Sequence, residues 1–344
     1  MKNKQYIGLA IVALAASIYI SACNNSTQTK EVSSTTPTAT ATTAAPASTH
    51  TMSHGSEAKI NINKALTSEL DKIEDKLSAP GLAEKIQAQR PYATTQELVS
   101  KKVIDQQQFD KVKDLLTIEE IALTGVEKDV DYMVKLGLMK GHLFVAKELL
   151  ALNKPKDAEP HIGHPVEEIY ADVADRLNER KIKEFKTTLA TLQSLVKAGA
   201  KDSTKVDASF KESMRSVDSA IAALPLTQRQ SPTFVLQVID GLLNTASSEY
   251  GAAIADGKIK AAIEYQDSRG FVTYANLLYQ EIATSMSKDH PQEHKVISES
   301  FKQLLTVWPT VVPPVNSVKT PIEVSKSIQD IQQSTQKVAI EPQK

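Results

Sequence analysis

The sequence predicts an all-α protein with a small N-terminal module of short helices and a larger helical bundle. Beyond residue 58, apolar residues recur at steps of three and four along most of the chain, as amphipathic helices require. Prolines and glycines interrupt this pattern at intervals that suit helix boundaries, and no long stretch alternates apolar and polar residues as a strand does. Two distant segments of the bundle also share one order of glycine, histidine and proline, which indicates an internal duplication.

The chain begins with the pattern of a bacterial export signal. Lys2 and Lys4 precede an apolar run that ends in Ile20-Ser21-Ala22-Cys23. The run is shorter than the roughly 20 apolar residues of a membrane-spanning helix. Ile-Ser-Ala-Cys resembles the lipobox of bacterial lipoproteins, in which the cysteine at the cleavage site receives diacylglycerol. The resemblance implies a signal peptide over residues 1–22 and a lipidated Cys23.

Cys23 is the only cysteine of the chain, and acylation by fatty acids such as palmitate explains both its position and its isolation. More than one acyl chain is needed for stable anchoring. The residues from 23 to about 57 are mostly Ser, Thr, Ala, Pro and Asn, a composition that buries too little apolar surface to fold. We therefore expect a membrane-anchored lipoprotein, with a polar tether, that faces the periplasm or the cell exterior.

The charge pattern disfavours nucleic acid as a partner. The formal net charge is -1, with acidic and basic residues interspersed rather than gathered on a basic face. The sequence contains no Gly-rich phosphate loop and no Gly-x-Ser-x-Gly elbow, and no nucleophile stands at a recognisable spacing from a base. Binding or scaffolding is therefore favoured over catalysis.

Residues 58–120 contain short amphipathic segments separated by turns. The apolar positions Leu66, Leu70 and Ile73 precede a turn at Pro80-Gly81, and a last helix carries Phe109. This order resembles the paired helix-hairpin-helix domain of ComEA-type proteins and of PsbU, an extrinsic photosystem II subunit that uses the fold without binding DNA. The resemblance implies a module that docks either on DNA or on a membrane-associated protein complex.

The turns of this module favour the protein partner. DNA-binding members carry Gly-x-Gly at each hairpin, because glycines let backbone N–H groups reach a phosphate. The first turn here keeps only Gly81, with Ala83 in the second glycine position, and the second turn, residues 103–106, has no glycine. This degenerate turn predicts a protein-docking role, and ComEA-like DNA binding is the less favoured alternative.

Residues 127–340 are expected to form the bundle domain, and its duplication rests on two pairs of matching segments. Lys140-Gly141-His142 is echoed by Arg269-Gly270-Phe271, and His164-Pro165-Val166-Glu167 by His290-Pro291-Gln292-Glu293, at nearly the same spacing. A glycine inside a helix lowers helix stability by about 1 kcal/mol, so we expect the two glycines to permit a close helix crossing. Arg269, with Glu264 and Asp267, is interpreted as an ordinary charged helix face.

All five histidines beyond the tether lie in these duplicated segments, which suggests a metal site. His142 shares a helical stripe with apolar residues and should point into the core. Imidazole and carboxylate together suit Zn, Fe, Cu or Mn. The expected ligands are His142, His161, His164, Glu167 and Glu168. A weaker second set, in which Phe271 replaces the counterpart of His142, comprises His290, Glu293 and His294.

The stretch Gly163-His164-Pro165-Val166-Glu167 is similar to the His-x-x-Glu signature of imelysin and EfeO-type periplasmic proteins, which are helical, duplicated and linked to metal uptake. The resemblance nominates His164 and Glu167, although glycine stands one residue earlier in those families. A purely structural interpretation stays open, since proline at the first helical position followed by acids is also a common helix start. The sequence thus predicts a lipid-anchored periplasmic binding or scaffold protein whose bundle holds a divalent transition metal.

Overall fold

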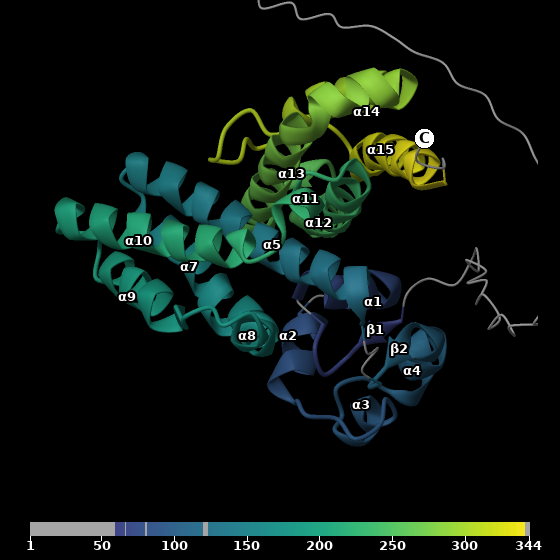
Figure 1. Ribbon diagram of the computed structural model, residues 1–344. Coiled ribbons are helices and arrows are strands. Elements are labelled where there is room, and N and C mark those ends of the chain that lie inside the picture. Colours follow the sequence, from purple (N-terminus) through teal and green to yellow (C-terminus); the bar gives the residue numbers. More distant parts are fainter. Residues whose placement is uncertain (1–58, 66, 80, 120–122, 341–344) are drawn as a thin grey trace, which may run out of the picture. The chain divides into compact units, whose positions relative to one another are not determined.

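The computed structural model describes residues 59–65, 67–79, 81–119 and 123–340 (Figure 1). The expected signal peptide, Cys23 and the tether lie outside the described residues. The described chain is all-α apart from two pairs of two-residue strands, so the predicted fold class is confirmed. None of the described helices is both long enough and apolar enough to cross a membrane.

The N-terminal module has a hydrophobic core of its own, formed by residues between Ile62 and Leu116. Its strands β1 and β2 pair in parallel and bring the two ends of the module together. In chain order the elements are β1 (Ile60–Asn61), α1 (Thr67–Leu77), α2 (Leu82–Ala88), α3 (Glu97–Ser100), α4 (Gln106–Val112), η1 (Lys113–Leu115) and β2 (Leu116–Thr117).

The two hairpin turns of the module are closed by side chains of the chain itself. In the first, Gly81 has a φ of 77°, and the Glu74 carboxylate accepts hydrogen bonds from the backbone N–H groups of Gly81, Leu82 and Ala83, at 2.9, 2.9 and 3.1 Å. In the second, Asp105 caps α4 through a reciprocal bond with Gln108, which replaces the missing glycines as the helix start. The amides that could cradle a phosphate in the first turn are therefore already bound to a carboxylate.

The first half of the bundle is a ring of helical segments. The long helix α5 packs against α7, α8 and α10, and α9 packs against α7 and α10, which closes the ring. The elements are α5 (Gly125–Ala151), α6 (Pro155–Ala158), α7 (Pro160–His164), the π-helical turn η2 (Pro165–Ile169), α8 (Tyr170–Glu179), α9 (Lys186–Lys197) and α10 (Ser203–Ala222).

The second half is a four-helix ring in which α12, α13, α14 and α15 each contact the next, and α15 packs back onto α12. A short antiparallel pair, β3–β4, turns through Asp256 and Gly257, whose φ values are 53° and 70°. Asp-Gly is a common sequence for such a two-residue turn, so the sequence did indicate this hairpin, although the helical pattern on both sides obscured it. The elements are α11 (Leu226–Arg229), α12 (Pro232–Ala253), β3 (Ile254–Ala255), β4 (Lys258–Ile259), α13 (Ala262–Asp289), α14 (Pro291–Leu305) and α15 (Pro321–Ile340).

The two halves meet where α5 crosses α13, and the crossing is as close as the glycines predicted. A methyl group added to Gly270 would lie only 2.8 Å from the carbonyl carbon of Gly141. A methyl group on Gly141 would lie 3.0 Å from the carbonyl carbon of Gly270. The backbones therefore touch at this point, and the side chains next to the two glycines are brought together.

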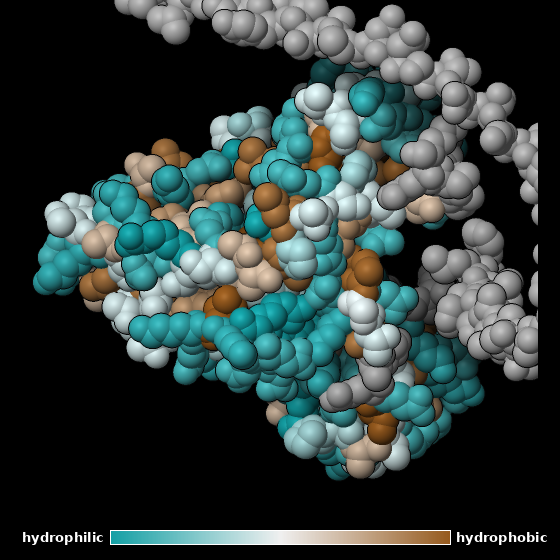
Figure 2. Space-filling view, in the orientation of Figure 1, coloured by the Kyte–Doolittle hydropathy of each residue, from teal (hydrophilic) through white to brown (hydrophobic). Residues whose placement is uncertain are grey.

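Apolar side chains from both halves form one continuous core, separate from that of the N-terminal module. On the face of the molecule shown in Figure 2, hydrophilic residues predominate and apolar residues are scattered between them. Such a surface is ordinary for a helical bundle. Four of the buried polar residues gather beside the crossing: His142, His161, Gln266 and Asp267.

Candidate metal centre

Three histidines and one aspartate converge beside the α5–α13 crossing. His142 comes from α5, His161 and His164 come from α7, and Asp267 comes from α13, one turn before Gly270. His142, His161 and Asp267 are 5%, 0% and 2% exposed, whereas the His164 side chain keeps about a third of its surface accessible, at 34%. His142 thus points into the core, as the helical stripe predicted.

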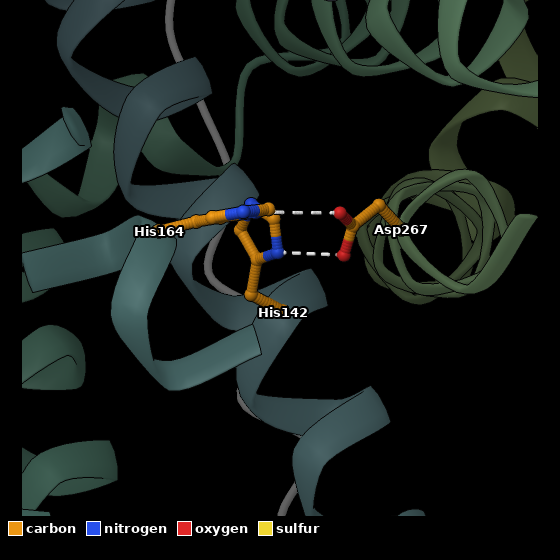
Figure 3. Close-up of side chains that lie close together, drawn as sticks. All are labelled: His142, His164 and Asp267. Carbon is orange, nitrogen blue, oxygen red and sulfur yellow. Dashed lines mark ion pairs between the residues drawn. The ribbon is translucent and has the colours of Figure 1, made fainter. Parts of the chain in front are cut away.

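The Asp267 carboxylate is the centre of the cluster. Its Oδ1 lies 2.7 Å from Nδ1 of His142 and 2.7 Å from Nδ1 of His161, and its Oδ2 lies 3.5 Å from Nδ1 of His164. Figure 3 shows the carboxylate facing the His142 and His164 rings, with one oxygen toward each. The His142 and His164 rings meet edge to face, with centroids 5.2 Å apart.

His161 holds Asp267 in place rather than facing the pocket. Its Nε2 lies 2.8 Å from Oε1 of Gln266, and the Gln266 amide donates its own N–H to the carbonyl of Val311 at 3.0 Å. Because that second bond fixes which end of the amide is the oxygen, Nε2 of His161 donates to Gln266, and the bond to the Asp267 carboxylate requires a proton on Nδ1 as well. The ring is locked between Gln266 and Asp267, as the outer partners of metal ligands usually are.

His142 has a buried nitrogen that makes no hydrogen bond within the described structure. Its Nδ1 lies 2.7 Å from Asp267 Oδ1, but the two atoms are not aligned as a hydrogen bond. A buried nitrogen left without a hydrogen bond is costly, and a cation shared with the carboxylate would satisfy it. Ligand atoms of His142, His164 and Asp267 all lie within 4.8 Å of one another, so one ion can reach all three.

Burial and the Asp267 carboxylate set the pKa values of the cluster. Burial lowers the pKa of His142, despite the attraction of Asp267, and so favours the neutral form of the ring, which is the form that can donate a lone pair. Burial alone would raise the pKa of Asp267, yet His142 and His161 outweigh it and hold the pKa well below the usual range. Burial also opposes a charge on His164, but Asp267, Glu168 and Glu264 outweigh it and raise its pKa to about 9.

The segment carrying His164 differs from the expected helix start. Pro165 lies inside a continuous helical run, 160–179, because α7 passes through the π-helical turn η2 into α8. Proline has no N–H to donate, and the N–H of Tyr170 bonds to the carbonyl of Pro165, five residues back. The residue added to this turn rotates the rest of the helical run by about 100°.

The two predicted glutamates have different surroundings in this turn. Glu168 lines a pocket together with His164, whereas Glu167 is exposed and accepts a hydrogen bond from Gln193 at 2.9 Å. Gln193 also donates to Glu159 at 3.0 Å and so ties α9 to α7. The structure therefore does not bring Glu167 to the histidines.

The pocket beside the cluster has a volume of about 370 Å³. His142, His164 and Asp267 form one part of its wall. The remaining charged lining residues are all acids, from α1, η2, α12 and α13: Asp71, Glu74, Glu168, Glu249 and Glu264. No lysine or arginine is among the described residues that line it.

The second predicted set does not assemble. His290 precedes the first residue of α14, so His290-Pro291 is the helix start that the structural interpretation foresaw. His294 lies with its Nδ1 2.9 Å from the hydroxyl of Tyr279. Within the described residues, no close group of three metal-ligating side chains includes His290, Glu293 or His294.

Asp267 is the residue that sequence reasoning missed, because it was assigned to a charged helix face. Asp267 and Phe271 are four residues apart on α13 and share a face, and Phe271 packs edge-on against His142 with ring centroids 5.0 Å apart. The predicted crossing at Gly141 and Gly270 was therefore the sequence signal that could have identified Asp267. Once those glycines are paired, an acid one turn before Gly270 must lie close to His142.

Residues 225–341 match the sequence model of the iron permease-associated 4-helix bundle domain. The match takes in α11 to α15, so it includes Asp267 but none of the three clustered histidines. No curated protein and no solved structure matches the chain at a significant level. The resemblances to ComEA, PsbU and imelysin gain no support from these comparisons and stay predictions.

Proposed function

We propose that the protein is a lipid-anchored periplasmic binding protein for a divalent transition metal, which His142, His164 and Asp267 would hold. The observation that carries this proposal is the buried His142 Nδ1, which makes no hydrogen bond and lies 2.7 Å from an ionised carboxylate. Two imidazoles and one carboxylate that leave open positions form a set used for ferrous iron in other proteins. His161 would act on the ion through Asp267, by fixing the orientation of that carboxylate.

Iron is the ion we favour among Zn, Fe, Cu and Mn. The donor atoms alone suit all four metals. The match of residues 225–341 to an iron permease-associated domain supports iron, because that segment supplies the carboxylate of the cluster. Glu168 lines the same pocket and is a candidate further ligand, whereas Glu167 is no longer proposed as one.

Metal content tests this function directly. The full-length protein, purified in detergent, is loaded separately with Fe²⁺ without oxygen, and with Zn²⁺, Cu²⁺ and Mn²⁺, and the bound metal is measured by mass spectrometry. We expect one ion per chain, lost in His142→Ala and Asp267→Asn and kept in the matched control His294→Ala. Absence of stoichiometric metal in the unmodified protein would refute the function.

Acylation of Cys23 is the second part of the proposal. Its support is the lipobox-like sequence Ile20-Ser21-Ala22-Cys23, since the residues themselves lie outside the described structure. Cells that express the chain can be fed an alkyne-labelled palmitate. The label should appear on the unmodified protein and be lost in Cys23→Ala; equal labelling of both would exclude this anchor.

A second candidate function is docking of residues 58–120 on a membrane-associated protein complex. The Glu74 carboxylate accepts hydrogen bonds from the backbone amides of the first hairpin turn and leaves no place there for a DNA phosphate, which favours a protein partner over DNA. A carboxylate in that position also repels a phosphate. In-cell cross-linking from Lys85, exposed on α2, should recover a reproducible protein partner, and duplex DNA should not bind at low salt.

A further inference from the structure

The lining of the pocket beside the histidine–aspartate cluster indicates which chemical form of the metal the site can bind. Acidic side chains from several separate elements line it, and one of them, Asp71, belongs to the N-terminal module and is only 8% exposed. The buried His142 Nδ1, which makes no hydrogen bond, lies in the wall of the same pocket, so the acids and this nitrogen face one space.

The size of this space fits a hydrated ion. An octahedral aqua ion carries six waters, which at about 30 Å³ each occupy about 180 Å³. The pocket, at about 370 Å³, has room for such an ion together with a few more waters. Carboxylate oxygens can replace those waters one at a time before the imidazoles bind.

The acidic lining of the pocket disfavours anionic complexes of the metal. A complex of iron with citrate or another polycarboxylate is an anion, and it would have to approach the carboxylates of Glu168, Glu249 and Glu264. A pocket lined mainly by acids concentrates cations and speeds their association by a factor of about 10 to 1,000. The same field repels an anionic complex.

We propose that this acidic pocket admits the free, hydrated divalent cation and rejects anionic metal chelates, with Glu249 and Glu264 speeding the capture of the ion. The inference rests on the proposed function, since it names the form of the metal that the site takes. Asp71 extends the acidic wall from the N-terminal module, so both folded parts of the chain contribute to the selection.

The first test asks whether the protein takes up the free ion or its citrate complex. Co²⁺ serves as the probe because its visible absorption reports binding and it is stable in air. The full-length protein is mixed with Co²⁺–citrate buffers that hold free Co²⁺ constant while the complex increases. We expect the observed rate to follow free Co²⁺ alone; a rate that rises with the complex at constant free Co²⁺ would overturn the proposal.

The second test asks whether the acids speed capture. Glu249→Gln/Glu264→Gln should lower the association rate for Co²⁺ about tenfold at low salt and weaken its dependence on salt. The matched control is Glu212→Gln/Glu299→Gln, which removes two carboxylates from exposed ion pairs on α10 and α14 and should leave the rate unchanged. Each pocket substitution is also measured singly, so that misfolding of the double variant cannot hide the effect.

The possible results distinguish failure of the proposed selection by the pocket from failure of the proposed metal binding. If the unmodified protein takes up Co²⁺ and the pocket variants keep its rate and salt dependence, the inference is wrong and the metal site stands. If the unmodified protein takes up no Co²⁺ at all, the proposed function fails and the inference fails with it.

Discussion

The two halves of the bundle share sequence elements but use them differently. At the crossing of α5 and α13, His142 of the first half faces Phe271 of the second. His164-Pro165 lies inside a helical run through a π-helical turn, whereas His290-Pro291 begins α14. The same dipeptide therefore presents a ring to a buried carboxylate in one half and starts a helix in the other.

The candidate site depends on both halves of the bundle. The first half supplies the three imidazoles and the second supplies Asp267, which reaches across the contact made by the two glycines. The family match covers only the second half, so it takes in the carboxylate without the histidines. Gly141 and Gly270 permit the close crossing, and different side chains on its two sides make the cluster asymmetric.

The largest effect is expected from the one ligand that the second half contributes. Asp267→Asn keeps the size of the side chain but removes the charge that faces all three imidazoles. Affinity for Co²⁺, measured by calorimetric titration, should fall by more than the roughly 10- to 100-fold typical of outer partners. Unchanged affinity would show that the first half binds metal alone.

A smaller loss is expected from His161, which touches Asp267 and Gln266. His161→Gln should weaken Co²⁺ binding by roughly 10- to 100-fold and leave the number of ions per chain unchanged. A complete loss of stoichiometry would instead make His161 a direct ligand.

The crossing itself can be tested by adding one methyl group. Gly270→Ala should destabilise the protein by roughly 1–3 kcal/mol, because the methyl group meets the backbone of Gly141 and neither helix can yield freely. Gly251→Ala is the matched control in α12, where nothing lies within 4 Å of the new methyl group. It should stabilise by up to about 1 kcal/mol through helix propensity. Thermal unfolding measures both, and similar shifts would contradict the close crossing.

The dependence on pH comes from His164, whose folded-state pKa of about 9 is above its ordinary value of 6.5. Its contribution to the stability of the metal-free protein is therefore complete below pH 6.5 and is lost as the pH rises through about 9. A metal must displace that proton, so affinity should rise with pH up to about 9 and then level off. Co²⁺ titrations at several pH values check this, and His164→Ala should flatten the dependence.

The smallest effect is expected from the second half's own histidines. His290→Ala/His294→Ala removes a helix-start residue and a partner of the Tyr279 hydroxyl. Metal stoichiometry and affinity should stay unchanged, with at most a modest fall in melting temperature. A halved metal content would show a second site and restore the symmetry of the two halves.

Much of the fold could be predicted from the sequence, because burial decides where the helices lie. The apolar stripe through His142 predicted a buried ring, and the glycines at 141 and 270 predicted a close crossing, since each has a direct physical reason. The β3–β4 turn was missed although Asp256-Gly257 signals it. Each strand has only two residues and lies between long helices, so the helical pattern on both sides obscured the turn.

The candidate site was less predictable, because it depends on how separate helices meet. A stripe on one helix shows which side is buried but not which residue of another helix lies opposite, so the sequence placed Asp267 at the surface. The choice between Glu167 and Glu168 depended on the π-helical turn in which both lie. Sequence spacing alone cannot give the rotation added by such a turn.

The most direct test of the central claim is to locate the metal. A crystal of the full chain soaked in Fe²⁺ without oxygen, measured on both sides of the iron absorption edge, would show the ion by its anomalous scattering. We predict one peak at about 2.0–2.2 Å from nitrogen atoms of His142 and His164 and from an oxygen of Asp267. An iron peak elsewhere, or none beside a fully ordered cluster, would contradict the account.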